Sequence, residues 1–282
     1  MTPPPLPTSS HPDMAYLAER SEMNAYESLA KPGAALRLER FGSAVALWSP
    51  EVSDTLNLNR VLGLGLDDPA SPEILDAIAA LYARRQRSFG VEVGSWARPA
   101  ELVTWLKARR MRRVFDTALY VKGLSGTVEP SRYATVRRAA TPAECDQAAR
   151  ICCTVFRMAP PVVALLAGLQ DDSRWRHWLV FDGERPLAAA LSFVDRDTAW
   201  LGWDATLPEA RGRGLHAALI AARIDEARRA GCVFATSETA VDTSARTDPS
   251  GANYRKLGFV LACRRSTYVA MLPRMTTPSG IA

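Results

Sequence analysis

The sequence predicts an α/β protein built from two similar halves. Hydrophobic periodicity and turn residues give each half the order helix, hairpin, strand, helix, strand, helix, strand. A short segment rich in glycine, serine and proline, residues 124–131, separates the halves and is expected to be a linker. With 282 residues, 48% of them hydrophobic, the chain is long enough for two domains of average size.

The first half, residues 14–123, opens with a helix over 14–30 that ends at the Pro32-Gly33 stop signal. Around Gly42 the alternating residues predict a hairpin. Ser71 as N-cap and Pro72 as the first helical residue predict a helix over 71–87. The same periodicities predict the other elements: strands at 35–41, 43–48, 55–66, 89–93 and 114–123, and a helix at 99–110.

The second half, residues 132–275, has equally clear start and stop signals. Thr141 and Glu144 form a capping box at the start of a helix over 141–156. Gly231 follows the helix over 215–230, in the position where a left-handed residue ends a helix. The remaining elements are strands at 133–139, 175–182, 186–195, 198–207, 232–238, 258–262 and 266–272, and helices at 161–169 and before Leu257.

Composition excludes several functional classes. Residues 1–13 lack the basic and apolar segments of a signal peptide and are expected to be a disordered tail, as are residues 276–282. The longest apolar run, 159–169, is too short to span a bilayer. We therefore expect a cytoplasmic protein with no membrane partner.

The net charge of +5 comes from arginines spread along the whole chain rather than gathered in one block, so a nucleic-acid partner is not expected. The five cysteines form no CxxC pair, and only three histidines accompany them. This usage is typical of buried, reduced thiols and predicts no metal site.

One loop suggests a ligand. The segment LPEARGRGLHAALI, Leu207 to Ile220, places Gly212 and Gly214 between arginines, directly before an apolar helix. The first N–H groups of a helix lack internal partners, and glycines allow a ligand to approach the backbone closely. A diphosphate fits such a loop, while a tight turn is the purely structural interpretation. The loop is neither a Walker loop nor a dinucleotide fingerprint.

The second half, over roughly residues 132–272, resembles the GCN5-related N-acetyltransferase (GNAT) superfamily. The loop Arg211-Gly212-Arg213-Gly214-Leu215-His216 is similar to the pyrophosphate loop Arg/Gln-x-x-Gly-x-Gly/Ala of that family, although His216 stands where Gly or Ala is usual. The segment Tyr254-Arg255-Lys256-Leu257-Gly258-Phe259 is similar to the end of the family's last helix. The resemblance implies a tandem GNAT form, each half with a mixed, mostly antiparallel sheet flanked by helices.

The resemblance also implies acetyl-CoA as co-substrate, without a metal. The loop would bind the pyrophosphate, and the strand ending in Asp204 to Leu207 would present backbone groups to the pantetheine arm. An amide of Asn253 would contact the cofactor or cap a turn. The residues expected to bind acetyl-CoA are Ala205, Thr206, Leu207, Arg211, Gly212, Arg213, Gly214, Leu215, His216 and Asn253.

Three residues are candidates for proton transfer. Tyr254 occupies the position of the family's general acid, although it would also serve simply to pack under its helix. Asp204 and Glu238, at the ends of neighbouring strands, are the two candidates for the general base. The first half carries Asp67 and Asp68 where a phosphate would need positive charge, so it is expected to be degenerate and not to bind CoA.

The predicted function is direct transfer of an acetyl group to a primary amine of a small molecule or peptide. The alternative is a non-catalytic acyl-CoA-binding or sensing module. Either a monomer or a homodimer is expected.

Overall fold

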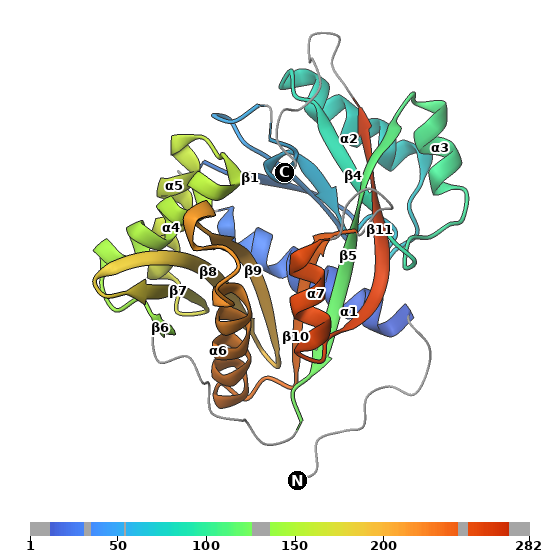
Figure 1. The fold of residues 1–282 in the computed structure, drawn as a ribbon. Coiled ribbons are helices and arrows are strands. Elements are labelled where there is room, and N and C mark those ends of the chain that lie inside the picture. Colours follow the sequence, from blue (N-terminus) through green and yellow to red (C-terminus); the bar gives the residue numbers. More distant parts are fainter. Residues whose placement is uncertain (1–11, 31–34, 54, 126–135, 242–247, 271–282) are drawn as a thin grey trace. The chain divides into compact units, whose positions relative to one another are not determined.

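The computed structural model describes residues 12–30, 35–53, 55–125, 136–241 and 248–270, which form two compact units (Figure 1). Within these ranges the N-terminal unit contains residues 12–119 and 262–270, and the C-terminal unit contains residues 120–261. The predicted domains, 14–123 and 132–275, assign residues 262–270 differently, and these bounds stay a prediction. Most of the predicted linker and both predicted tails lie outside the described residues.

The N-terminal unit has a mixed sheet. Strands β1, β2 and β3 pair in antiparallel fashion, β3 pairs with β4 in parallel, and β4 pairs with β11 in antiparallel fashion. The elements are α1 (Pro12–Leu29), β1 (Arg37–Phe41), β2 (Ala44–Trp48), β3 (Arg60–Leu62), α2 (Pro72–Arg84), β4 (Phe89–Val93) and α3 (Leu102–Ala108). Apolar residues of α2 and α3 pack with the sheet in one buried cluster, which includes Val61, Leu75, Ile78, Val91 and Leu106.

A buried ion cluster joins residues 262–270 to this unit. Arg265 on β11 (Val260–Ala270) donates hydrogen bonds to Glu19 and Glu22 of α1, at 2.8 and 2.6 Å. Arg60 on β3 donates to Glu22 at 2.6 Å, and its other guanidinium nitrogen lies 3.5 Å from Glu92 on β4. Since a buried charge without its partner is strongly unfavourable, these contacts hold β11 in the unit.

The C-terminal unit also has a mixed, mostly antiparallel sheet, as predicted. Strands β6 to β9 pair in antiparallel fashion, and β10 pairs with β9 in parallel. The elements are β6 (Val136–Arg138), α4 (Pro142–Phe156), α5 (Pro160–Ala167), β7 (Trp175–Asp182), β8 (Arg185–Asp195), β9 (Thr198–Thr206), α6 (Leu215–Arg229), β10 (Phe234–Ala240) and α7 (Pro249–Lys256). Helices α4 and α6 pack on β8 and β9, and α7 packs on α6 and β10 (Figure 1).

Local signals in the sequence set the helix ends. The Thr141 hydroxyl accepts a hydrogen bond from the Glu144 N–H at 3.2 Å, and the Ser71 hydroxyl caps α2 in the same way. Gly231 has a φ of +84°, the left-handed conformation expected after α6. These three predictions are confirmed.

Two strand predictions differ from the structure. The predicted strand over 55–66 is a 3₁₀ turn (Leu56–Leu58) followed by the short β3. The two strands predicted at 258–262 and 266–272 are the single strand β11, which is described as far as Ala270. The charged pair Arg264-Arg265 breaks the apolar pattern, but Arg265 is buried because its carboxylate partners lie inside the unit.

The boundary between the units falls within β11 and within β5 (Arg112–Gly123).

In the described part of the chain, no helix combines the length and apolar character needed to cross a membrane.

Candidate active site

The glycine-rich loop leads into helix α6 with its backbone open. Gly212 and Gly214 have φ angles of +77° and +78°, which L side chains rarely adopt. A Cβ atom at Gly212 would meet no described atom within 4 Å. Gly214 is the N-cap of α6, and no side-chain cap forms there, whereas Ser71 and Thr141 cap α2 and α4. Among the residues that the structure describes, the first N–H groups of α6 are therefore without a side-chain cap.

The arginines of the loop are exposed. Arg213 forms a 2.9 Å ion pair with Asp182, the last residue of β7, and both side chains are about half exposed. Arg185, on the same hairpin, pairs with Glu209 at 2.5 Å. Exposed pairs of this kind contribute about 0–1 kcal/mol, so an arriving anion can replace Asp182 at little cost.

Strands β9 and β10 pair over one short stretch. The parallel register joins residues 198–200 to residues 234–236, and beyond it the Ser237 hydroxyl donates to the Leu201 carbonyl at 2.7 Å. On its other edge β9 carries a bulge opposite β8, where Trp203 has a φ of +58°. The bulge directly precedes Asp204.

The residues predicted to face the pantetheine follow this bulge. Ala205 and Thr206 pair with Ala189 and Ala188 of β8. The Leu207 N–H donates to the Leu187 carbonyl at 3.0 Å, so this donor is occupied by β8.

Asp204 and Tyr254 meet at the centre of the C-terminal unit. The Tyr254 hydroxyl donates a 2.6 Å hydrogen bond to Asp204 Oδ2, and the Arg223 guanidinium donates to Asp204 Oδ1. Burial opposes ionisation of Asp204, but the charge of Arg223, the neighbouring His216 and the hydrogen bond from Tyr254 together outweigh it, so the pKa of this carboxyl is lowered. Burial and the neighbouring carboxylate raise the pKa of Tyr254 well above its usual value. A carboxylate and a phenol therefore face each other.

His216 and Asn253 lie beside this pair. The Asn253 Nδ2 and His216 Nδ1 atoms are 3.0 Å apart. His216 Nε2 lies 3.7 Å from Asp204 Oδ2, and the imidazole ring stands edge-on to the Tyr254 ring with centroids 5.8 Å apart. Four predicted site residues, from β9, α6 and α7, are thus brought together.

Glu238 on β10 contacts a different side chain. The Trp200 indole donates to Glu238 Oε2 at 2.8 Å, and the carboxylate is partly exposed.

Arg223 was missed by the sequence interpretation. Its guanidinium also donates to the Leu191 carbonyl at 3.0 Å, and the residue is only 1% exposed. The available signal is its place among the apolar residues of α6, where an arginine requires a buried acid.

In the N-terminal unit, the corresponding loop after β3 is closed by its own chain. Gly65 has a φ of +79°, and a Cβ atom there would lie 2.6 Å from backbone atoms of Arg98. The Arg98 carbonyl accepts from the Ala70 N–H at 2.8 Å, just before α2. The predicted acid Asp67 is paired with Arg20 and accepts from Tyr16 at 3.0 Å. Protein groups therefore fill the space that a phosphate would need.

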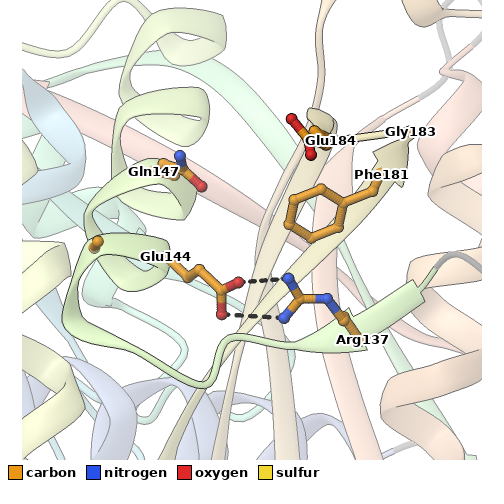
Figure 2. A pocket seen from close by; sticks show the side chains of 7 residues that line it. Arg137, Glu144, Gln147, Phe181, Gly183 and Glu184 are labelled. Atoms are coloured by element: carbon orange, nitrogen blue, oxygen red, sulfur yellow. Dashed lines mark hydrogen bonds and ion pairs between the residues drawn. The ribbon is translucent and has the colours of Figure 1, made fainter.

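A separate pocket of about 530 Å³ lies between β6, the start of α4 and the turn after β7 (Figure 2). Its lining includes Arg137, which pairs with Glu144 and lies over the Phe181 ring at 4.4 Å. Because Glu144 already neutralises this arginine, the pocket is not suited to an anion. None of the predicted site residues lines it.

Comparison with known proteins agrees with this arrangement. Residues 144–259 match the family model described as acetyltransferase (GNAT) family. This match includes the loop before α6 and the Tyr254 to Phe259 segment. No curated protein sequence matches the chain.

Solved structures share the fold over both units. A GCN5-related N-acetyltransferase from Kribbella flavida has a TM-score of 0.64 at 18% identity, covering 93% of this chain and 97% of that chain. One from Sphaerobacter thermophilus has a TM-score of 0.61 at 13% identity, with 93% of each chain covered. A tandem GNAT protein from the clavulanic acid biosynthesis pathway has a TM-score of 0.60 at 15% identity, covering 92% of this chain and 93% of that chain.

Proposed function

Because residues 144–259 belong to the acetyltransferase (GNAT) family, we propose that this protein transfers an acetyl group from acetyl-CoA to a primary amine. The supporting observation is the meeting of two features in one unit. The glycine-rich loop leads into helix α6, whose start has no side-chain cap among the described residues. Arg223 and His216 belong to the same helix. Those two residues contact Asp204 beside Tyr254, so an anion-binding element and a proton-transfer element share one helix.

Acetyl-CoA is proposed to bind along β9 and at the start of α6. Its pyrophosphate would accept hydrogen bonds from the N–H groups after Gly212, and Arg211 and Arg213 would neutralise its charge. The pantetheine would follow the edge of β9 beyond Trp200, where the parallel register with β10 ends. A backbone N–H of this edge would hydrogen-bond the thioester oxygen and stabilise the oxyanion.

Transfer then needs one acid and one base. The amine nitrogen attacks the thioester carbon, the C–S bond breaks, and its electron pair goes to sulfur. Tyr254 is proposed to protonate this thiolate, because a phenol keeps its proton at neutral pH and Asp204 orients the Tyr254 hydroxyl.

We assign the base to Glu238 rather than to Asp204. Both Asp204 oxygens are engaged, by Arg223 and Tyr254, and its lowered pKa makes it a weak proton acceptor. Glu238 is partly exposed and is oriented by the Trp200 indole. Asp204 then serves to orient Tyr254.

The test is release of free thiol from acetyl-CoA against a panel of small amines and of peptides with lysine side chains. Turnover that depends on one class of amine supports the proposal. Tight acetyl-CoA binding without turnover on any amine would favour the sensing module instead.

A further inference from the structure

Among the described residues, one ring nitrogen of His216 has no hydrogen-bond partner. Its Nε2 atom is buried, and in the described part of the chain no group lies within hydrogen-bonding distance of it. The nearest carboxylate oxygen is Asp204 Oδ2 at 3.7 Å. A normal N–H···O hydrogen bond is about 2.7–3.2 Å long. The distance between His216 Nε2 and Asp204 Oδ2 is therefore too long for a hydrogen bond, although the carboxylate is close by.

The other ring nitrogen fixes which nitrogen carries the proton. The Asn253 amide nitrogen is a donor, and it lies 3.0 Å from His216 Nδ1. Nδ1 must therefore accept, and in the neutral ring the proton is on Nε2. His216 thus directs an N–H donor at Asp204.

Asp204 Oδ2 is already in use. It accepts from the Tyr254 hydroxyl at 2.6 Å, while Oδ1 accepts from Arg223. If Tyr254 turns its hydroxyl to a leaving thiolate, Oδ2 loses this donor. A buried carboxylate oxygen without a donor is unfavourable, and that cost would oppose the turn of Tyr254.

We propose that His216 is a positioning residue that takes over the hydrogen bond to Asp204 Oδ2 when Tyr254 turns to the sulfur of CoA. This inference rests on the proposed acetyl transfer. The proton on sulfur comes from Tyr254, the imidazole keeps its Nε2 proton, and the tyrosinate regains a proton from water after CoA leaves. His216 needs only to shorten its 3.7 Å distance from Asp204 Oδ2 to that of a hydrogen bond, and it transfers no proton.

The position itself makes the idea testable. His216 stands where the GNAT pyrophosphate loop usually has Gly or Ala, so a small residue is compatible with the loop. His216→Ala should therefore leave the loop intact and remove only the alternative donor. His216→Gln restores an amide N–H of similar reach.

The kinetic test compares these variants at saturating amine. His216→Ala should lower kcat by about 10-fold, the effect of one lost hydrogen bond, with an unchanged KM for acetyl-CoA. His216→Gln should recover most of kcat. In a Tyr254→Phe background, His216→Ala should have no further effect. A changed KM with normal kcat would overturn the proposal, as would an equal loss in both backgrounds.

A second measurement needs no turnover. The chain has three histidines, so the imidazole resonances of His216 can be assigned by NMR with a His216→Gln reference. We expect the Nε2–H tautomer in the wild type and a downfield shift of this proton in Tyr254→Phe, where Asp204 Oδ2 is left without its donor. The Nδ1–H tautomer, or an unshifted proton, would overturn the proposal. A shifted proton in a protein that acetylates no amine would instead refute acetyl transfer and leave the exchange of donors standing.

Discussion

The Tyr254 hydroxyl donates to Asp204 Oδ2 at 2.6 Å, inside a unit where Tyr254 is fully buried. The partner of the proposed acid is thus a carboxyl whose pKa is lowered, with the charge of Arg223 as the largest of the lowering causes. Two residues 50 positions apart, on β9 and α7, form one polar element next to the glycine-rich loop.

Tyr254→Phe should lower kcat by about 10²-fold while the affinity for acetyl-CoA stays the same, because the ring remains and only the acid is lost. The measurement is the initial rate at saturating co-substrate, with affinity from calorimetry. Tyr120→Phe is the matched control. Tyr120 is also buried and stacks on Tyr254, but its hydroxyl accepts a hydrogen bond from Arg255 and not from the proposed site. Equal rates for Tyr254→Phe and wild type, with the chemical step limiting, would remove Tyr254 from the mechanism.

Glu238→Gln should lower turnover near neutral pH by about 10²-fold or more, because the amine loses its proton acceptor. The glutamine oxygen can still accept from the Trp200 indole, so the local structure is retained. The loss should shrink as the pH rises, since more of the amine is then already neutral. Glu209→Gln, which changes an exposed acid near the loop, is the control. A loss that is independent of pH would argue against Glu238 as base.

Asp204→Asn should destabilise the protein by about 3–5 kcal/mol at pH 7, because Arg223 is left buried without its charge partner. The pKa of Asp204 is lowered in the folded protein, so its contribution is fully present above the unfolded value near 3.8. It is lost as the pH falls through the lower, folded pKa. The gap in unfolding free energy between the variant and the wild type should therefore begin to narrow below about pH 4 in urea unfolding experiments.

The control for this experiment is Asp182→Asn, which breaks the exposed pair with Arg213. It should cost at most about 1 kcal/mol. A gap between Asp204→Asn and wild type that stays constant down to pH 2.5 would contradict the assignment of an ionised, paired Asp204.

The two glycine loops predict a difference in stability. Gly65 and Gly212 have nearly equal φ angles, +79° and +77°, but a Cβ atom would collide with the Arg98 backbone at Gly65 and meet open space at Gly212. Gly65→Ala should therefore lower the free energy of unfolding by about 1–3 kcal/mol more than Gly212→Ala. At Gly212 the added methyl group causes only backbone strain. Chemical unfolding of both variants measures the difference. Equal costs would mean that the N-terminal loop is not closed.

Much of the fold could be predicted from the sequence because its signals are local. Caps at Ser71 and Thr141 and the left-handed Gly231 mark helix ends within a few residues. Strand β11 was predicted as two strands because the Arg264-Arg265 pair interrupts its apolar pattern. The acids that bury Arg265 come from α1 and β4, and contacts so distant in sequence leave no local signal.

The candidate site shows the same limit. The loop and Tyr254 carry motifs that can be read directly. The roles of Asp204 and His216 depend on which side chains meet in space, and Arg223, which decides the charge of Asp204, belongs to no motif. His216 stands where the family usually has Gly or Ala, and the structure places its ring beside Asp204 and Asn253.

The most direct test of the account is calorimetric titration of acetyl-CoA into the wild type, Gly212→Asp and Gly231→Asp. Gly231 also has a left-handed φ, and no described atom lies within 4 Å of a Cβ position there, but Gly231 follows the opposite end of α6. We predict one site per chain in the wild type, because the N-terminal loop is filled by Arg98. Gly231→Asp should bind like the wild type, and Gly212→Asp should bind at least about 10-fold more weakly, since it places a carboxylate beside the pyrophosphate. Equal affinity in all three proteins, or two equivalent sites per chain, would contradict the account.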